Sequence, residues 1–189
     1  MRFVGIDPST KTGFVALDLD GRVLKAKELT GIGDKDPKRM ATMIDNIMAH
    51  VHSGDSIVIE GFGFNSQQAI QLGGIGWGIR MALLRRGMDY TEVAPNAVKK
   101  FVNVTGWIGE PGHKRRLQNR EKKQAVMDAV REHFGFSHRS DNVVDAYIMA
   151  QIARHIHMAD CSMNNGYLPV YQAEVLESIL RPKKKAKAK

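Results

Sequence analysis

Cysteine is almost absent from this 189-residue chain, which contains only Cys161. One cysteine cannot form a disulfide within the chain, and no Cys/His cluster of the kind that binds structural zinc is present. Long apolar runs are lacking as well, so the sequence predicts neither a membrane-spanning helix nor a secretory signal. We therefore expect a cytoplasmic protein with no membrane association.

Acidic residues are outnumbered, since 28 Lys and Arg face 20 Asp and Glu and leave a net charge of +8. Six of these positive charges fall in residues 181–189, so residues 1–180 carry a net charge of only +2. A second basic block spans His113–Lys123. Basic blocks on a nearly neutral body indicate a polyanionic partner.

Chain length and a hydrophobic content of 43% fit one ordinary domain. We place this domain at residues 1–160 and a C-terminal extension at residues 161–180. Residues 181–189 are rich in lysine, which predicts a disordered basic tail.

The chain begins with two short apolar runs around a polar turn, which predicts a β-hairpin. Asp7 directly follows the first run, Phe3–Ile6. Ser56–Glu60 is another apolar strand that ends in a carboxylate. A continuous apolar strand is usually buried within a sheet, and beside the first strand it would bring Glu60 and Asp7 to one edge. Asp7 could instead serve only to start an Asx-Pro turn.

The hydrophobic periodicity along the rest of the chain predicts an α/β fold. A helix at residues 67–86 contains four glycines, which favour close approach of another backbone: the protein's own sheet, a second copy of the chain or a bound strand. Further strands are expected at residues 22–29 and 90–93, helices at 37–52, 96–102, 121–134, 141–158 and 172–180, and a loop at 105–118.

Two more acids, Asp141 and Asp145, open the helix expected at residues 141–158. They are four residues apart and so share one helical face. Stabilisation of the helix N-terminus explains Asp141 equally well, but Asp145 precedes a buried-looking stretch. Together with Asp7 and Glu60 these acids form an all-oxygen set, which selects Mg²⁺ or Mn²⁺. Two such ions support in-line displacement at phosphorus.

Several motifs follow the order found in the RuvC family of Holliday junction resolvases, which the sequence resembles over most of residues 1–158. The resemblance implies an RNase H-like α/β fold with a central mixed five-stranded sheet flanked by helices. It also implies a homodimer that nicks opposing strands of a four-way DNA junction with two Mg²⁺ ions, for which Mn²⁺ can substitute. Divergent bacteriophage members resemble this pattern, which implies a phage enzyme. The motifs are Gly5–Gly13, Ile57–Glu60, Ala94-Pro95 with Lys99-Lys100, Lys122–Val126 and Asp141–Ala146.

By position, the resemblance implies that Asp7, Glu60 and Asp145 are metal ligands. The family commonly spaces its helical acids by three, and Asn142 stands at that position here. The fourth ligand is therefore Asp141, Asn142 or water. The resemblance further implies a catalytic role for Lys123 and DNA contacts by Phe62, Phe64, Lys99, Lys100 and Lys122, to which the basic block adds Lys114, Arg115 and Arg116.

Three other functions fit parts of the same pattern. They are an ATP-using protein of the actin and sugar-kinase class, a non-catalytic junction-binding protein, and an RNase H-type nuclease that cuts RNA–DNA hybrids. The segment Trp107–Gln118 is longer than its counterpart in bacterial RuvC proteins, and the basic tail is additional. Both departures favour action on branched DNA beyond four-way junctions.

Overall fold

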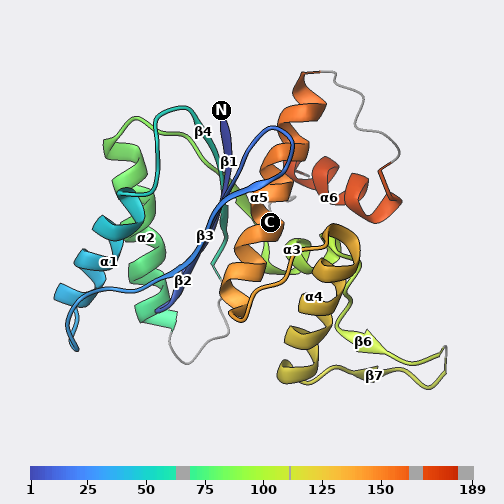
Figure 1. Ribbon diagram of the computed structural model, residues 1–189. Coiled ribbons are helices and arrows are strands. Elements are labelled where there is room, and N and C mark those ends of the chain that lie inside the picture. Colours follow the sequence, from blue (N-terminus) through green and yellow to red (C-terminus); the bar gives the residue numbers. More distant parts are fainter. Residues whose placement is uncertain (63–68, 111, 162–167, 183–189) are drawn as a thin grey trace, which may run out of the picture.

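A computed structural model describes residues 1–62, 69–110, 112–161 and 168–182. A mixed sheet with the strand order β3-β2-β1-β4-β5 lies at its centre (Figure 1). The pairs β1–β2 and β2–β3 are antiparallel, whereas β1–β4 and β4–β5 are parallel. The strands are β1 (Arg2–Asp7), β2 (Thr12–Leu17), β3 (Val23–Leu29), β4 (Asp55–Glu60) and β5 (Thr91–Val93).

Six helices cover the two faces of this sheet within the described residues, and none of them is long and apolar enough to cross a membrane. The predicted order of strands and helices is confirmed, with boundaries shifted by a few residues. The helices are α1 (Lys38–Met48), α2 (Ala69–Arg85), α3 (Pro95–Phe101), α4 (Asn119–Phe134), α5 (Asp141–Asp160) and α6 (Val170–Leu180).

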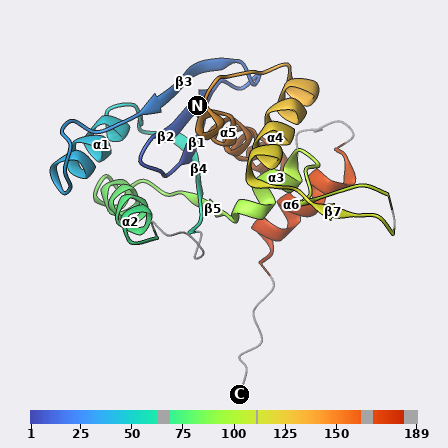
Figure 2. The same ribbon diagram turned by 90° about the horizontal axis from the view of Figure 1, so that it is seen from below.

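The sheet separates two hydrophobic cores, because successive side chains of a strand point to opposite faces. Phe3 and Val15 face the core formed with α3, α4, α5 and α6. Val4, Ile6 and Phe14 face the core formed with α1 and α2. Figure 2 shows these two helical layers on either side of the strands.

The register of the central strands places two acids at one edge of the sheet. Ile6 on β1 lies opposite Ile59 on the parallel strand β4. The next residues, Asp7 and Glu60, therefore leave the sheet side by side, as the sequence predicts. Both strands are buried and paired on each side, so this edge is a rigid support for the two side chains.

Two glycines allow α5 to approach this edge closely. A Cβ atom on Gly5 would lie 1.9 Å from the carbonyl oxygen of Ala146, and one on Gly13 would lie 1.9 Å from that of Asn142. Asp145 is located between these two contact points on α5. Because Gly5 and Gly13 have no side chains, α5 can pack close enough to bring Asp145 to the sheet edge.

Replacing Gly5 with Ala is expected to destabilise the fold by at least about 3 kcal/mol, since the added methyl group would overlap the α5 backbone. Denaturant unfolding measures this loss. Gly106→Ala is the matched control, because its added Cβ would meet only the Lys122 side chain at 3.9 Å. Equal stability of the two variants would contradict the role assigned to Gly5.

The glycines of α2 have different surroundings. Added Cβ atoms on Gly74 and Gly78 would meet the side chains of Met40 and Ile44 on α1 at 3.0 and 2.2 Å. These two glycines therefore serve packing within the chain. Gly73 has no such neighbour within 4 Å among the described residues.

The segment expected to be a loop at residues 105–118 contains a short hairpin. Its strands are β6 (Trp107–Ile108) and β7 (Arg115–Arg116), paired with Trp107 opposite Arg116 and Ile108 opposite Arg115. Strands of two residues are too short to show the alternation that identifies a strand in a sequence. The hairpin projects from the body beside α4 (Figure 1).

Candidate active site

Asp7, Glu60 and Asp145 meet at the shared ends of β1 and β4 and influence one another's ionisation. Asp7 is buried, with 6% of its surface exposed, and burial followed by the charge of Glu60 raises its pKa well above the usual value. Burial and then Asp145 raise the pKa of Glu60 to about 7. Burial raises the pKa of Asp145 to about 6. The cluster therefore resists holding three negative charges without a cation.

The donor set fits hard divalent cations, because all its ligand atoms are carboxylate oxygens. Asp7 and Glu60 lie close enough for each to affect the pKa of the other, so a cation between them would relieve their repulsion. Among the described residues, no three His, Cys, Asp or Glu side chains converge tightly enough to hold an ion in this conformation.

Asp141 and Asn142 lie at the start of α5 and point to different partners. Asp141 forms an ion pair with Lys123 of α4 and lines the same cavity as Asp145. Burial raises the pKa of Asp141, but the hydrogen bond and charge of Lys123 together with backbone hydrogen bonds outweigh it, so the pKa is lowered overall. The Asn142 amide donates a hydrogen bond to the Lys11 carbonyl oxygen at 2.8 Å. Asp141 is thus the better placed of the two to complete the acid cluster.

Ser140 precedes these acids, at the position where a serine often caps a helix. Its hydroxyl instead donates a hydrogen bond to Glu28 on β3 at 2.5 Å, and it makes no capping hydrogen bond. This contact joins the start of α5 to the outer strand of the sheet.

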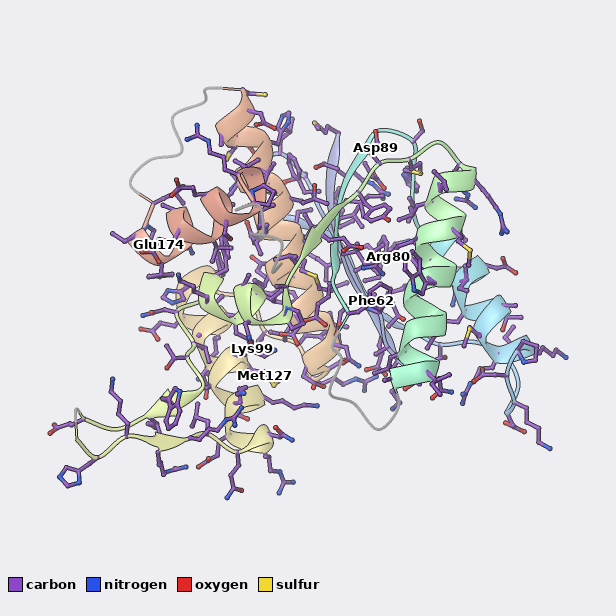
Figure 3. The ribbon with its side chains drawn as sticks, turned by 180° about the vertical axis from the view of Figure 1, so that it is seen from behind. Phe62, Arg80, Asp89, Lys99, Met127 and Glu174 are labelled. Atoms are coloured by element: carbon purple, nitrogen blue, oxygen red, sulfur yellow. The ribbon has the colours of Figure 1, made fainter. Side chains whose placement is uncertain are left out.

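A cavity of about 280 Å³ lies between α3, α4 and α5 beside the acids. Lys99 on α3 lines it, and its charge opposes the raised pKa values of all three acids. Lys122, Lys123, Asp141 and Asp145 line the same cavity. Figure 3 shows Lys99 close to Met127, which forms part of the apolar wall. Acids and bases therefore meet in a space that could admit a phosphate group.

Arg80 is a buried residue of the site that the sequence analysis did not identify. It has 2% of its surface exposed and pairs with Glu92 at 2.5 Å. Its guanidinium donates to the Glu60 carbonyl oxygen at 3.0 Å and lies 4.4 Å from the centre of the Phe62 ring (Figure 3). Arg80 thus fixes the backbone of one acid and the ring that follows it. In the sequence, its position as an arginine within an apolar helical stretch could have identified it.

The aromatic residues after β4 were predicted to stack on a base. The Phe62 ring packs against Trp77 of α2 with ring centres 5.2 Å apart. A cavity of about 470 Å³ lies beside these rings and is also lined by Glu60 and Pro8. Phe64 lies outside the described residues.

The predicted DNA-binding basic residues fall into two groups. Lys100 and Arg115 form ion pairs, with Glu174 at 2.5 Å and with Glu121 at 2.7 Å. Neither Arg116 nor Lys122 has an ion-pair partner within the part of the chain that the structure describes. Lys114 is exposed near the tip of the β6–β7 hairpin.

Comparison with known proteins identifies related sequences and structures, although no family model matches the chain. Crossover junction endodeoxyribonuclease RuvC of Rhizobium etli is 32% identical over 116 residues, which cover 56% of this chain and 68% of that protein. The structure of Thermus thermophilus RuvC matches with a TM-score of 0.57 at 19% identity, covering 86% of this chain and 98% of that chain. The T. thermophilus RuvC complex with Holliday junction substrate matches with a TM-score of 0.56 at 16% identity, covering 86% and 97%.

The structural matches confirm the expected RNase H-like fold with its mixed five-stranded sheet. The matched sequence and the acid cluster at the sheet edge point to one kind of chemistry. Grouped carboxylates beside lysines can bind cations and a phosphate together.

Proposed function

The chain belongs to the RuvC family of crossover junction endodeoxyribonucleases, and we propose that it cuts four-way DNA junctions, and further branched DNA, by two-metal phosphodiester hydrolysis. The observation that carries this proposal is the meeting of Asp7, Glu60 and Asp145 at one rigid edge of the sheet. We propose Mg²⁺ as the cofactor, with Mn²⁺ as a substitute, and a bacteriophage origin.

Asp7, Glu60, Asp145 and Asp141 would hold two cations in this site. When bound, these ions supply a nucleophilic water and stabilise the leaving 3′-oxygen. Lys99 lowers the cost of gathering the carboxylates, because its charge opposes their mutual repulsion. Lys123 pairs with Asp141 and lines the cavity, and in this proposal it would contact the scissile phosphate there.

The DNA would be held by residues around this site. We propose that the DNA phosphates are contacted by Lys99, Lys100 and Lys122 and by the hairpin residues Lys114, Arg115 and Arg116. Phe62, backed by Trp77 and Arg80, offers a rigid ring for stacking on a base at the junction centre. Phosphate contacts by basic residues make such binding strongly dependent on salt.

A homodimer would place two such sites on one junction. Ile70, Trp77 and Leu84 recur at seven-residue spacing on α2 and form an exposed apolar stripe, with 94% of Ile70 and 75% of Leu84 exposed. Residues seven apart lie on one helical face. An exposed apolar stripe of this length is typical of an interface.

Replacing Leu84 with Glu is expected to convert the dimer to a monomer, because the interface would bury an unpaired charge. Light scattering coupled to size-exclusion chromatography measures the mass. Leu24→Glu on β3 is the control, since Leu24 is also an exposed leucine but lies on a different element. Dimers of unchanged mass in the Leu84 variant would place the interface elsewhere.

The decisive experiment compares labelled four-way junction, three-way and flap DNA, linear duplex and RNA–DNA hybrid, each with and without Mg²⁺. Metal-dependent paired nicks in the four-way junction, with weaker cutting of other branched DNA and none of linear duplex, are expected. Preferential cutting of the hybrid would instead favour the RNase H-type alternative. Tight junction binding without cutting under any divalent metal would favour the non-catalytic alternative, whose basis was Asn142.

A further inference from the structure

The β6–β7 hairpin borders two adjoining hollows that differ in their charged residues. The larger one, about 810 Å³, lies between the hairpin and α4, and its charged lining residues are Arg120, Glu121 and Asp128. Trp107 lines both hollows. The smaller one, about 600 Å³, has no acidic residue in its lining. It will be called the hairpin groove, and its charged and aromatic lining residues are Lys99, Lys100, Trp107, Arg116, Lys122 and Tyr171.

The hairpin groove is continuous with the active site. Lys99 and Lys122 line both the groove and the cavity that contains Asp141 and Asp145. The Lys122 ammonium group lies at the base of the hairpin, 3.9 Å from the position that a Cβ atom on Gly106 would take. A strand whose phosphate reaches the acids can therefore extend into the groove along these lysines.

One face of the hairpin supplies the groove with a ring and a charge. Trp107 and Arg116 are directly opposite each other across the two strands, so their side chains lie on the same face. Trp107 has 56% of its surface exposed, which leaves its indole available for stacking. The next pair, Ile108 and Arg115, lies on the opposite face, and Arg115 is held by Glu121.

The hairpin is fixed to the body of the protein at its base. The Leu117 amide donates to the Gly106 carbonyl oxygen at 2.9 Å, which closes the base of the hairpin. The Arg115 guanidinium joins the hairpin to α4 by donating to both Glu121 carboxylate oxygens at 2.8 and 2.7 Å. These contacts hold Trp107 at a set position relative to α4. Little side-chain ordering is therefore required when a base stacks on the ring.

We propose that the hairpin groove binds an unpaired nucleotide of the strand being cut, next to the scissile phosphate, with its base stacked on Trp107 and its phosphates held by Arg116 and Lys122. This inference rests on the proposed function and specifies the substrate more narrowly. A basic groove with an aromatic platform suits a single strand, and a space of about 600 Å³ admits one or two nucleotides. The enzyme would thus prefer branch points that already contain an unpaired base.

The test measures binding of two four-way junctions, one fully paired and one with a single mismatch beside the cut position, to Asp7→Asn protein, which should not cut them. The mismatched junction should bind about tenfold more tightly, because no base pair has to be opened. Trp107→Ala should abolish this preference. Ile108→Ala, which removes a similarly exposed side chain from the opposite face, should keep it.

The inference would be overturned if the Asp7→Asn protein bound both junctions equally well. It would also be overturned if the Trp107 and Ile108 variants preferred the mismatched junction to the same extent. Loss of preference in both variants would also overturn it, because the effect would then belong to the hairpin as a whole. Arg116→Gln should weaken binding of both junctions more than Lys38→Gln, an equal change of charge on α1. Junction cutting by the wild-type protein is measured in parallel, so failure of the proposed function would be recognised separately.

Discussion

Asp7→Asn should reduce junction cleavage by roughly a thousandfold or more while leaving junction binding nearly intact, because the amide removes the buried charge that the cations need. Glu60→Gln should have the same effect. Asp7 is buried at the sheet edge, so its replacement by a residue of equal size should leave the surrounding lysines in place. Cleavage is measured with labelled junction in Mg²⁺, and binding is measured in its absence.

Asp89→Asn is the matched control for this experiment. Asp89 is an exposed acid near the end of α2, distant from Lys99 in Figure 3. Its replacement should leave both cleavage and binding unchanged. Loss of junction binding in both Asp7→Asn and Glu60→Gln would show that the acids support the fold rather than the chemistry.

The metal-free protein should lose stability as the pH rises from 5 to 8. An unfolded chain releases the protons of these carboxyls near pH 4, whereas the folded protein retains them until about pH 6 at Asp145 and about pH 7 at Glu60. Between these values the folded state binds more protons, so the free energy of unfolding falls as the pH increases. We expect a decrease of roughly 5 to 10 °C in melting temperature.

Asp7→Asn isolates the contribution of the cluster in this measurement. Burial lowers the pKa of His155, and this shift makes the folded protein more stable as the pH rises. The change of melting temperature with pH must therefore be compared between wild type and the variant. The variant should show a weaker loss of stability and a higher melting temperature than wild type at pH 8. Saturating Mg²⁺ should raise the wild-type melting temperature more at pH 8 than at pH 5. If the melting temperatures of the two proteins changed equally with pH, the mutual repulsion of these acids would be contradicted.

The sheet and the position of two acids were predictable from sequence because their signals are local. An apolar run followed by a carboxylate marks Asp7 and Glu60, and helical periodicity marks α1, α4 and α5. Asp145 was also identified, since its motif lies at the start of a helix with a buried face. These features depend on neighbours along the chain and not on distant contacts.

The remaining features depend on contacts between distant segments. Nothing in the sequence around Gly5 and Gly13 indicates that a helix packs against them. Charged residues are rarely buried, so Arg80 is unexpected inside a core. The hairpin was predicted to be a loop because the pairing of Trp107 with Arg116 involves strands of only two residues. The different partners of Asp141 and Asn142, which are Lys123 and the Lys11 carbonyl oxygen, cannot be derived from sequence spacing.

The placement of the third acid also has a consequence during protein synthesis. Asp7 and Glu60 emerge early from the ribosome, but Asp145 reaches them only when α5 has been made and packed against β1 and β2. Domains generally fold as whole units, and parallel pairings such as β1 with β4 close slowly. A chain that ends before α5 therefore brings only Asp7 and Glu60, and not Asp145, to this edge of the sheet.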